Sequence, residues 1–204
     1  NDKTASIANK LGAKVIKVPT RKPGFAAEFA KMHGFVLASK DLVMYLDADI
    51  ELVGNDWFQQ MIRPLVNSKI TASFTRYLKR DDDNAFRRYM CFDPLQRDGL
   101  FQFLTPSPEE LIVKNVSNYY YICKYSPGKI PPAGVCLYRR KELMPLLYEQ
   151  KAFMELDILA QFVEQGHDQF AYVPTAGLYH LHAGSIGELL AKRKRNITGV
   201  YFLH

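Results

Sequence analysis

Two aspartates separated by a single residue are the most chemically informative feature of the sequence. Asp47 and Asp49 follow the apolar run of residues 42–46, and Ala48 lies between them. In an extended chain, residues i and i+2 point to the same side. Both carboxylates can therefore bind one hard cation, Mg²⁺ or Mn²⁺, and leave positions for phosphate oxygens. The alternative is a polar exit from a strand into a loop, with an Asx turn.

A second pair of carboxylates begins a helix that the sequence predicts nearer the C-terminus. Glu155 and Asp157 lie in residues 153–165, whose apolar side chains recur at helical spacing and which Gly166 ends. Carboxylates suit the positive end of a helix, which is a purely structural explanation. A carboxylate that faces a cleft can also act as a general base and accept a proton from an attacking hydroxyl.

Basic residues supply candidate contacts for a phosphate group. Lys22 lies in a basic turn, and Arg193 and Arg195 lie in the basic run of residues 192–195 at the end of the last predicted helix. These side chains can bind a pyrophosphate or the headgroup of an anionic lipid. The alternatives are a solvated turn for Lys22 and, for the two arginines, cations that suit the C-terminal end of a helix.

The elements that would position these groups alternate along the chain. Apolar periodicity predicts helices over residues 2–11, 25–38, 55–66, 85–92, 139–148, 153–165 and 186–196. It predicts strands over residues 14–18, 42–46, 69–78, 133–138, 170–173 and 178–182. This order favours an α/β fold with a Rossmann-like mixed, mostly parallel sheet flanked by helices. Asp47 and Asp49 fall beyond the carboxyl end of a strand, where such folds bind ligands.

Length and composition are those of one folded domain over residues 1–204, with 48% hydrophobic and 24% charged residues. Residues 93–132 are rich in proline and aromatic residues. We expect an irregular insertion there, which either packs under a loop or forms an acceptor-binding loop. Because Asn1 opens directly into a helix-like segment, we also expect that an N-terminal piece is missing.

The net charge limits the classes of partner, and the cysteine content indicates the cellular location. The net charge of +6 favours anionic partners, but the basic residues are scattered and no recognised nucleic-acid motif is present, so no nucleic acid is expected. Three widely spaced cysteines without CxxC spacing indicate buried reduced thiols and a cytoplasmic location. The basic and aromatic C-terminal end is compatible with peripheral contact at the inner face of a membrane.

The order of these features resembles the family 2 glycosyltransferases, which have the GT-A fold. The matching pieces are residues 1–4 (the end of a polar D-x-T cluster), 24–27 (G-x-A), 46–49 (D-x-D), 132–140 (the glycine-containing strand before the acceptor helix) and 155–157 with 171–174 and 179–180 (the catalytic-base helix and the segments after it). Residues 93–131 lie outside the resemblance. The chain departs from the family in two ways: Leu156 separates two carboxylates that are usually adjacent, and the first strand and turn, which bind the nucleotide base, are absent.

The resemblance implies a metal-dependent, inverting transferase that uses a UDP- or GDP-sugar and a carbohydrate or polyprenyl-phosphate acceptor. It implies Asp49 as the direct metal ligand and Asp47 as a second ligand or a ribose contact. His180 resembles the histidine that completes the metal site in some relatives, and a strand-end histidine bonded to the backbone is the alternative. Position favours Glu155 as the catalytic base, whereas chemical identity favours Asp157.

Two other classes share a related fold. A sugar-phosphate nucleotidyltransferase has a similar sheet, but it needs a glycine-rich phosphate loop that is not seen in this sequence. The other class is a non-catalytic protein of the GT-A fold that binds carbohydrate or nucleotide. Only a test of whether Glu155 or Asp157 is needed for turnover distinguishes it from a transferase.

Overall fold

The computed structural model describes residues 2–18, 26–91, 103–148, 152–181 and 183–198 of the chain. Its helices are α1 (Thr4–Lys10), α2 (Ala26–Leu37), α3 (Trp57–Ile62), α4 (Ala85–Cys91), α6 (Arg140–Tyr148), α7 (Glu155–Glu164) and α8 (Ile186–Asn196), with short 3₁₀ helices η1 (Arg63–Val66) and η3 (Pro108–Leu111). Its strands are β1 (Leu42–Val43), β2 (Ile50–Leu52), β3 (Ala72–Phe74), β4 (Tyr77–Leu78), β5 (Ile112–Ser117), β6 (Tyr120–Lys124), β7 (Cys136–Arg139), β8 (Gln169–Tyr172) and β9 (Leu178–His180).

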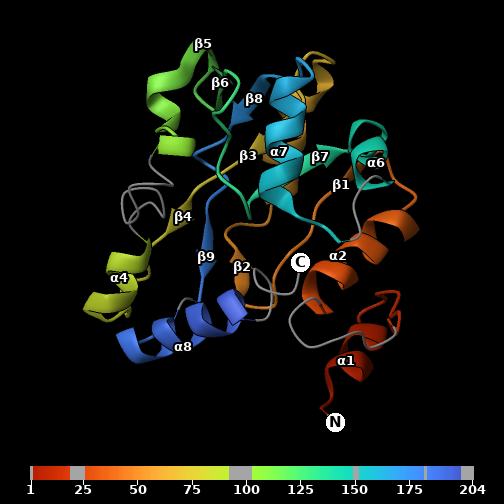
Figure 1. Cartoon of the computed structure of the whole chain (residues 1–204), viewed down its shortest axis with the longest axis vertical. Helices are drawn as coiled ribbons and strands as arrows, with labels where there is room; N and C mark the ends of the chain where they lie inside the picture. The colour runs from red at the N-terminus through yellow and green to blue at the C-terminus, as the bar shows by residue number, and fades with distance from the viewer. Residues whose placement is uncertain (1, 19–25, 92–102, 149–151, 182, 199–204) are drawn as a thin grey trace.

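The described strands form two sheets (Figure 1). The six-stranded sheet has the order β1-β7-β3-β8-β6-β5, and the three-stranded sheet has the order β2-β9-β4. The α/β fold with a mixed sheet is confirmed, but the expectation of a mostly parallel sheet is wrong for these strands. Only β3–β8 and β4–β9 are parallel among the described pairs.

The antiparallel pairing has two causes. Strand β7 lies between β1 and β3 and runs opposite to both, so β1 and β3, which run in the same direction, are not neighbours. Strands β5 and β6 are joined by a tight turn, and a connection that short can only join antiparallel strands. The described part of the segment expected to be irregular, residues 103–132, therefore contains a hairpin, with two shifts of register, that joins the large sheet through the pairing of β6 with β8.

Three predicted strands differ from the structure. Of the strand predicted over residues 42–46 only Leu42–Val43 is formed, and Asp49 lies in a turn, so Asp47 and Asp49 do not share the extended geometry expected of them and meet different partners. Residues 14–18 form no strand and residues 14–17 are exposed. Alternating polarity favours an extended chain, but a strand also needs a neighbouring strand to pair with. The single strand predicted over residues 69–78 is divided between β3 in one sheet and β4 in the other. Thr75 lies at the division, and its buried hydroxyl lies 2.8 Å from the carbonyl oxygens of both Val173 and Ala176. This anchor directs the chain from one sheet into the next.

Helix α7 is fixed by a continuous apolar face. Ile158, Leu159, Phe162 and Val163 are buried, with the i, i+1, i+4 spacing of one helix side. Burying side chains of this size contributes about 1.5–3 kcal/mol each. Helix α7 packs against α6, and α6 packs against α2. The first residue of α7, Glu155, is therefore held at the centre of the molecule.

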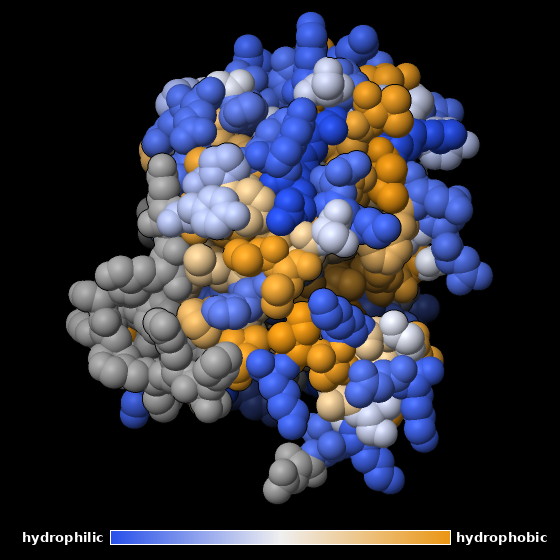
Figure 2. Space-filling view, turned by 90° about the vertical axis from the view of Figure 1, so that its right-hand side faces the viewer, coloured by the Kyte–Doolittle hydropathy of each residue, from blue (hydrophilic) through white to orange (hydrophobic). Residues whose placement is uncertain are grey.

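On the face shown in Figure 2, hydrophobic side chains gather between the upper and lower parts and along the upper right side, and hydrophilic side chains cover most of the rest. None of the described helices has the length and the apolar character that crossing a membrane requires.

Candidate functional site

Glu155 is the most firmly held of the predicted site residues. Its Oε2 accepts hydrogen bonds from the Tyr45 hydroxyl at 2.5 Å and the Gly134 N–H at 2.5 Å, and its Oε1 accepts one from the Tyr138 hydroxyl at 2.6 Å. The residue is only 9% exposed. The donors come from the segment after β1, the turn before β7 and β7 itself. We call these four residues the Glu155 cluster.

Burial governs the electrostatics of this cluster. It is the main cause that raises the pKa of Glu155, while hydrogen bonds from Tyr138, Tyr45 and Gly134 and the positive charge of Lys31 oppose it. Burial, with the Glu155 charge adding to it, also raises the pKa of both tyrosines. The tyrosines therefore stay protonated as donors, and Glu155 is a stronger base than an exposed glutamate.

Asp157 occupies a different position on the same helix. Two residues along an α-helix rotate a side chain by about 200°, so Asp157 points away from the Glu155 cluster. Its side chain is exposed. The two carboxylates that the sequence could not rank are thus separated by the structure: one is buried among hydrogen-bond donors and the other faces solvent.

Lys31 connects the first aspartate to this cluster. Its ammonium group on α2 lies 3.0 Å from Asp47 Oδ1 and 4.1 Å from the centre of the Tyr45 ring. Tyr45 in turn donates to Glu155. Asp47, Lys31, Tyr45 and Glu155 therefore form one continuous chain of contacts, from the aspartate pair to the start of α7.

Asp49 is brought to His180 by strand pairing. Strand β2 pairs with β9 so that Ile50 lies opposite His180, and the His180 Nε2 lies 3.3 Å from Asp49 Oδ2. Burial, with the positive charge of Lys192 adding to it, lowers the pKa of His180, while Asp49 opposes this. A neutral imidazole beside a carboxylate is a pair of metal ligands of the kind that Mn²⁺ accepts.

The three predicted metal ligands do not form one cluster. In the described part of the chain, no group of three or more His, Cys, Asp or Glu side chains is placed to hold a metal ion. Asp49 and His180 come together, whereas Asp47 is held by Lys31.

The predicted phosphate contacts are placed less centrally. Arg193 and Arg195 lie exposed on α8, whose Lys192 acts on His180. Lys22 lies outside the described residues.

Sequence reasoning missed four residues of the site. Lys31, Tyr45, Gly134 and Tyr138 all act on Glu155, but each belongs to a different segment. The one available signal was Tyr45 itself, because a tyrosine in an apolar buried run needs a partner for its hydroxyl. Gly134 has φ of +89°, a conformation that favours glycine.

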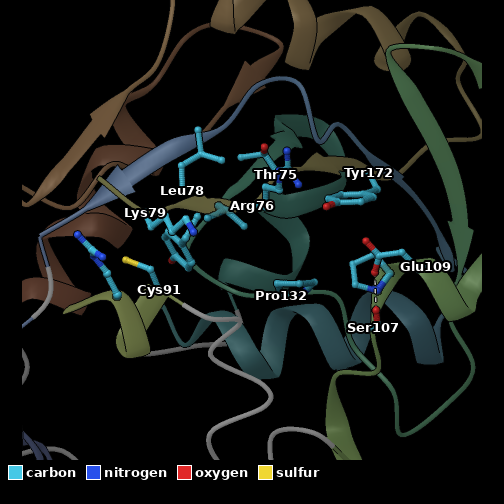
Figure 3. A pocket seen from close by; sticks show the side chains of 13 residues that line it. Thr75, Arg76, Leu78, Lys79, Cys91, Ser107, Glu109, Pro132 and Tyr172 are labelled. Carbon is cyan, nitrogen blue, oxygen red and sulfur yellow. Dashed lines mark hydrogen bonds between the residues drawn. The ribbon is translucent and has the colours of Figure 1, made fainter. Parts of the chain in front are cut away.

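Two cavities adjoin the Glu155 cluster. The first, of about 540 Å³, is lined by residues of β4, α4 and η3 and by Pro132 and Val135, which flank the turn at Gly134 (Figure 3). Tyr77 also lines it, and a Cβ added to Gly134 would lie 2.8 Å from the Tyr77 hydroxyl. The second cavity, of about 550 Å³, is lined by Lys31 and Tyr45. The cluster therefore borders one cavity through Tyr45 and the other through the turn at Gly134.

Comparison with protein families gives one match. The model described as Glycosyl transferase family 2 matches residues 1–133. This range contains Asp47 and Asp49, while Glu155 and His180 lie beyond it. No curated protein matches the sequence.

Two solved structures show the same fold at low identity. A structure described as that of a mycobacterial protein matches with a TM-score of 0.54 and 16% identity, over 98% of this chain and 60% of that chain. Glucosyl-3-phosphoglycerate synthase from Mycobacterium tuberculosis, in complex with phosphoglyceric acid, matches with a TM-score of 0.54 and 18% identity, over 97% of this chain and 63% of that chain. The same enzyme in complex with Mn²⁺, uridine diphosphate and glucosyl-3-phosphoglycerate gives a TM-score of 0.48 and 17% identity, over 98% and 63%. The chain thus spans 60–63% of these proteins.

Proposed function

The chain belongs to glycosyl transferase family 2, and from this premise we propose that it transfers a sugar from a nucleotide-sugar donor to an acceptor hydroxyl or phosphate. The observation that carries the proposal is the link made by Tyr45. Its hydroxyl donates to the buried Glu155, and the segment after β1 that carries it leads directly to Asp47 and Asp49. A base and a phosphate-binding segment are thereby held in one framework, which is what transfer from a nucleotide-sugar requires.

Asp49 and His180 are the proposed holders of a divalent cation, Mg²⁺ or Mn²⁺. Their ligand atoms lie 3.3 Å apart, and a carboxylate oxygen with a neutral imidazole nitrogen suits such an ion. When bound, the cation supplies positive charge that stabilises the leaving pyrophosphate of a UDP- or GDP-sugar. Asp47, which Lys31 already holds, is proposed to contact the ribose. The arginines of α8 are proposed to contact the pyrophosphate.

Glu155 is proposed as the general base in preference to Asp157. Among the described residues only Tyr138 donates to Glu155 Oε1, so this oxygen retains a lone pair for the acceptor hydroxyl. The hydroxyl oxygen attacks the anomeric carbon, its proton passes to Glu155, and the bond from that carbon to the pyrophosphate breaks. Direct attack with one base and no covalent intermediate inverts the anomeric centre.

A non-catalytic binding protein of the same fold is the second candidate. The observation that favours it is the number of donors on Glu155, because three hydrogen bonds are also what a carboxylate that only joins segments would accept. Turnover by variants of Glu155 separates the two candidates.

Contact with an anionic membrane surface is part of the proposal, through α8. Ile186 and Leu190 are 66% and 62% exposed there, and the cations of residues 192–195 are exposed on the same helix. Exposed apolar side chains beside cations suit peripheral contact with acidic lipid. The cytoplasmic side is proposed because the three cysteines are buried and none is in a disulfide.

Nucleotide binding is the first test. UDP and GDP are titrated by calorimetry with and without Mn²⁺ into the protein, an Asp49→Asn variant and an Asp81→Asn control, in which an exposed carboxylate is neutralised elsewhere. We expect binding that needs Mn²⁺, is lost in Asp49→Asn and persists in Asp81→Asn. Absence of binding to either nucleotide, with or without metal, would refute the transferase.

Turnover tests the base. Release of UDP or GDP from a panel of nucleotide-sugars is compared for Glu155→Gln and Asp157→Asn, with circular dichroism to verify that both variants are folded. Loss of a general base lowers kcat by about 10²- to 10⁴-fold, which we expect of Glu155→Gln alone. A folded Glu155→Gln protein with unchanged kcat would exclude Glu155 as the base, and unchanged turnover in both variants would favour the non-catalytic candidate.

A further inference from the structure

The cavity of about 540 Å³ beside the Glu155 cluster is lined by three cationic side chains, Arg76, Lys79 and Arg88. Its volume lies in the range of small-molecule sites. Figure 3 shows Arg76 on one wall, Lys79 and Cys91 at one end, and Glu109 with Ser107 and Tyr172 at the other. The cavity is therefore positive along one side and carries a carboxylate at the far end.

None of these three cations is neutralised by a carboxylate of the described chain. The Arg76 Nε donates to the Pro174 carbonyl at 3.2 Å. The Arg88 guanidinium donates to the backbone carbonyls of Asp81 and Asp83, at 2.8 Å each. Carbonyl oxygens satisfy hydrogen bonds but carry no formal charge, so the positive charges remain.

Their neighbour Arg80 shows the contrast. It does not line the cavity, and its guanidinium lies 2.7 Å from Glu51 and 3.8 Å from Asp82. Among the described residues, Arg80, which lies outside the cavity, is thus paired with carboxylates. Arg76 and Lys79, which line the cavity, form no ion pair with any carboxylate that the structure describes. Unpaired cations that share a concave surface attract an anion.

The single carboxylate of the described lining, Glu109, does not offset these charges. The Ser107 hydroxyl donates to it, which orients the carboxylate at the end of the cavity opposite Lys79 (Figure 3). A ligand that spans the cavity would therefore place an anionic group near the cations and a hydroxyl, which can donate to Glu109, at the other end.

We propose that this cavity binds an acceptor carrying a phosphate monoester, with Arg76 and Lys79 as the phosphate contacts. A phosphate monoester has several charged oxygens, and the planar guanidinium and the ammonium group can each bind one or more of them. The inference rests on the proposed function, because the turn at Gly134 joins this cavity to Glu155, the proposed base.

Binding of glycerol 3-phosphate, measured by calorimetry, tests the assignment. Lys79→Gln and Arg76→Gln each remove one cation, Glu109→Gln removes the opposing carboxylate, and Lys114→Gln is the matched control, because Lys114 is exposed on β5 away from the lining. Loss of one charge-assisted hydrogen bond weakens binding about tenfold, which we expect of Lys79→Gln and of Arg76→Gln.

Opposite effects within one cavity make this test strict. We expect Glu109→Gln to tighten glycerol 3-phosphate binding about threefold, because the repulsion between the carboxylate and the phosphate is removed while the amide oxygen can still accept from the ligand hydroxyl. We expect Lys114→Gln to leave the affinity unchanged. Equal affinity in the protein and in both cation variants would overturn the inference. So would an equal weakening in Lys114→Gln, which would indicate attraction by net charge alone.

Two further measurements separate the possible outcomes. UDP with Mn²⁺ is titrated into the same variants, and we expect its affinity to be unchanged. If UDP binding is intact but neither Arg76→Gln nor Lys79→Gln changes the affinity for glycerol 3-phosphate, this inference alone is overturned. Absence of UDP binding overturns the proposed function. Phosphatidylcholine vesicles with and without a polyprenyl phosphate distinguish a lipid from a soluble source, since only a lipid acceptor makes vesicle binding depend on Arg76 and Lys79.

Discussion

Replacing Tyr138 with phenylalanine should change stability by an amount that depends on pH. The Tyr138 hydroxyl is fully buried and donates to Glu155 Oε1 at 2.6 Å. Among the causes that lower the pKa of Glu155, this hydrogen bond is the largest, although burial outweighs it. Tyr138→Phe removes the bond and leaves that oxygen without its donor, so the pKa of Glu155 should rise further.

The magnitude depends on the charge of the acceptor. A hydrogen bond to a charged group contributes about 1.5–3 kcal/mol to folding, and one between neutral groups about 0.5–1.5 kcal/mol. The variant should therefore lose about 1 kcal/mol more at a pH where Glu155 is ionised than at a pH where it is protonated. Because the loss is greater in the ionised state, the pKa of Glu155 should be higher in the variant than in the wild type.

The assay is urea unfolding at several values between about pH 5 and about pH 8. The free energy of unfolding is compared for the wild type, Tyr138→Phe and a Tyr121→Phe control, which removes the hydroxyl of a half-buried tyrosine of β6 outside the Glu155 cluster. The deficit of Tyr138→Phe should grow as pH rises, and that of Tyr121→Phe should stay constant.

A deficit of Tyr138→Phe that is the same at every pH would refute this reasoning. It would mean that the hydroxyl stabilises the core by packing alone and does not respond to the charge on Glu155. Glu155, the proposed base, must be ionised to accept a proton, so the rising limb of the pH–rate profile should also move to higher pH in the variant.

Three further predictions use the same structure. Gly134→Ala should lower the free energy of unfolding in urea by about 1–3 kcal/mol, because φ is +89° and the new Cβ would lie 2.8 Å from the Tyr77 hydroxyl; Gly187→Ala, with nothing closer than 4.0 Å, should cost nothing. The stability of the wild type relative to Glu155→Gln should fall as pH rises through the raised pKa of Glu155, since a pKa raised by burial means that ionisation opposes folding; a difference that increases with pH would contradict this. Burial raises the pKa of Cys123 to about 12 and also raises the pKa of Cys136, so iodoacetamide should label these two cysteines at mildly alkaline pH only after denaturant is added, as read by mass spectrometry.

The helices were predictable because their signals are local. The pattern that predicts residues 25–38 corresponds to α2, and glycines at positive φ follow α1 and α7 where the sequence predicts the ends. Strand direction was not predictable, because it depends on which distant strand becomes the neighbour. Nothing in residues 133–138 indicates that β7 will lie between β1 and β3. Thr75 likewise gives no local sign that it divides one expected strand into two.

For the candidate site, the sequence marks residues only where a pattern exists, and their roles stay predictions. The aspartate spacing and the resemblance to a family predicted Asp49 and His180, which the structure brings together. The partners of Glu155 could not be predicted, because Tyr138 is 17 residues away and Tyr45 is 110 residues away. Which buried tyrosine meets which carboxylate is decided by packing, and one sequence carries no periodic trace of it.

The separation of 110 residues between Tyr45 and Glu155 has a consequence for synthesis on the ribosome. The segment with Asp47 and Asp49 emerges long before α7, so a nascent chain presents its aspartates while Tyr45 still lacks its acceptor. Closing so long a loop carries an entropic cost that only the packing of the intervening elements can offset. Competence for binding should therefore arise late, only after β9 with His180 has also left the exit tunnel, and nascent chains that end before residue 180 should lack it.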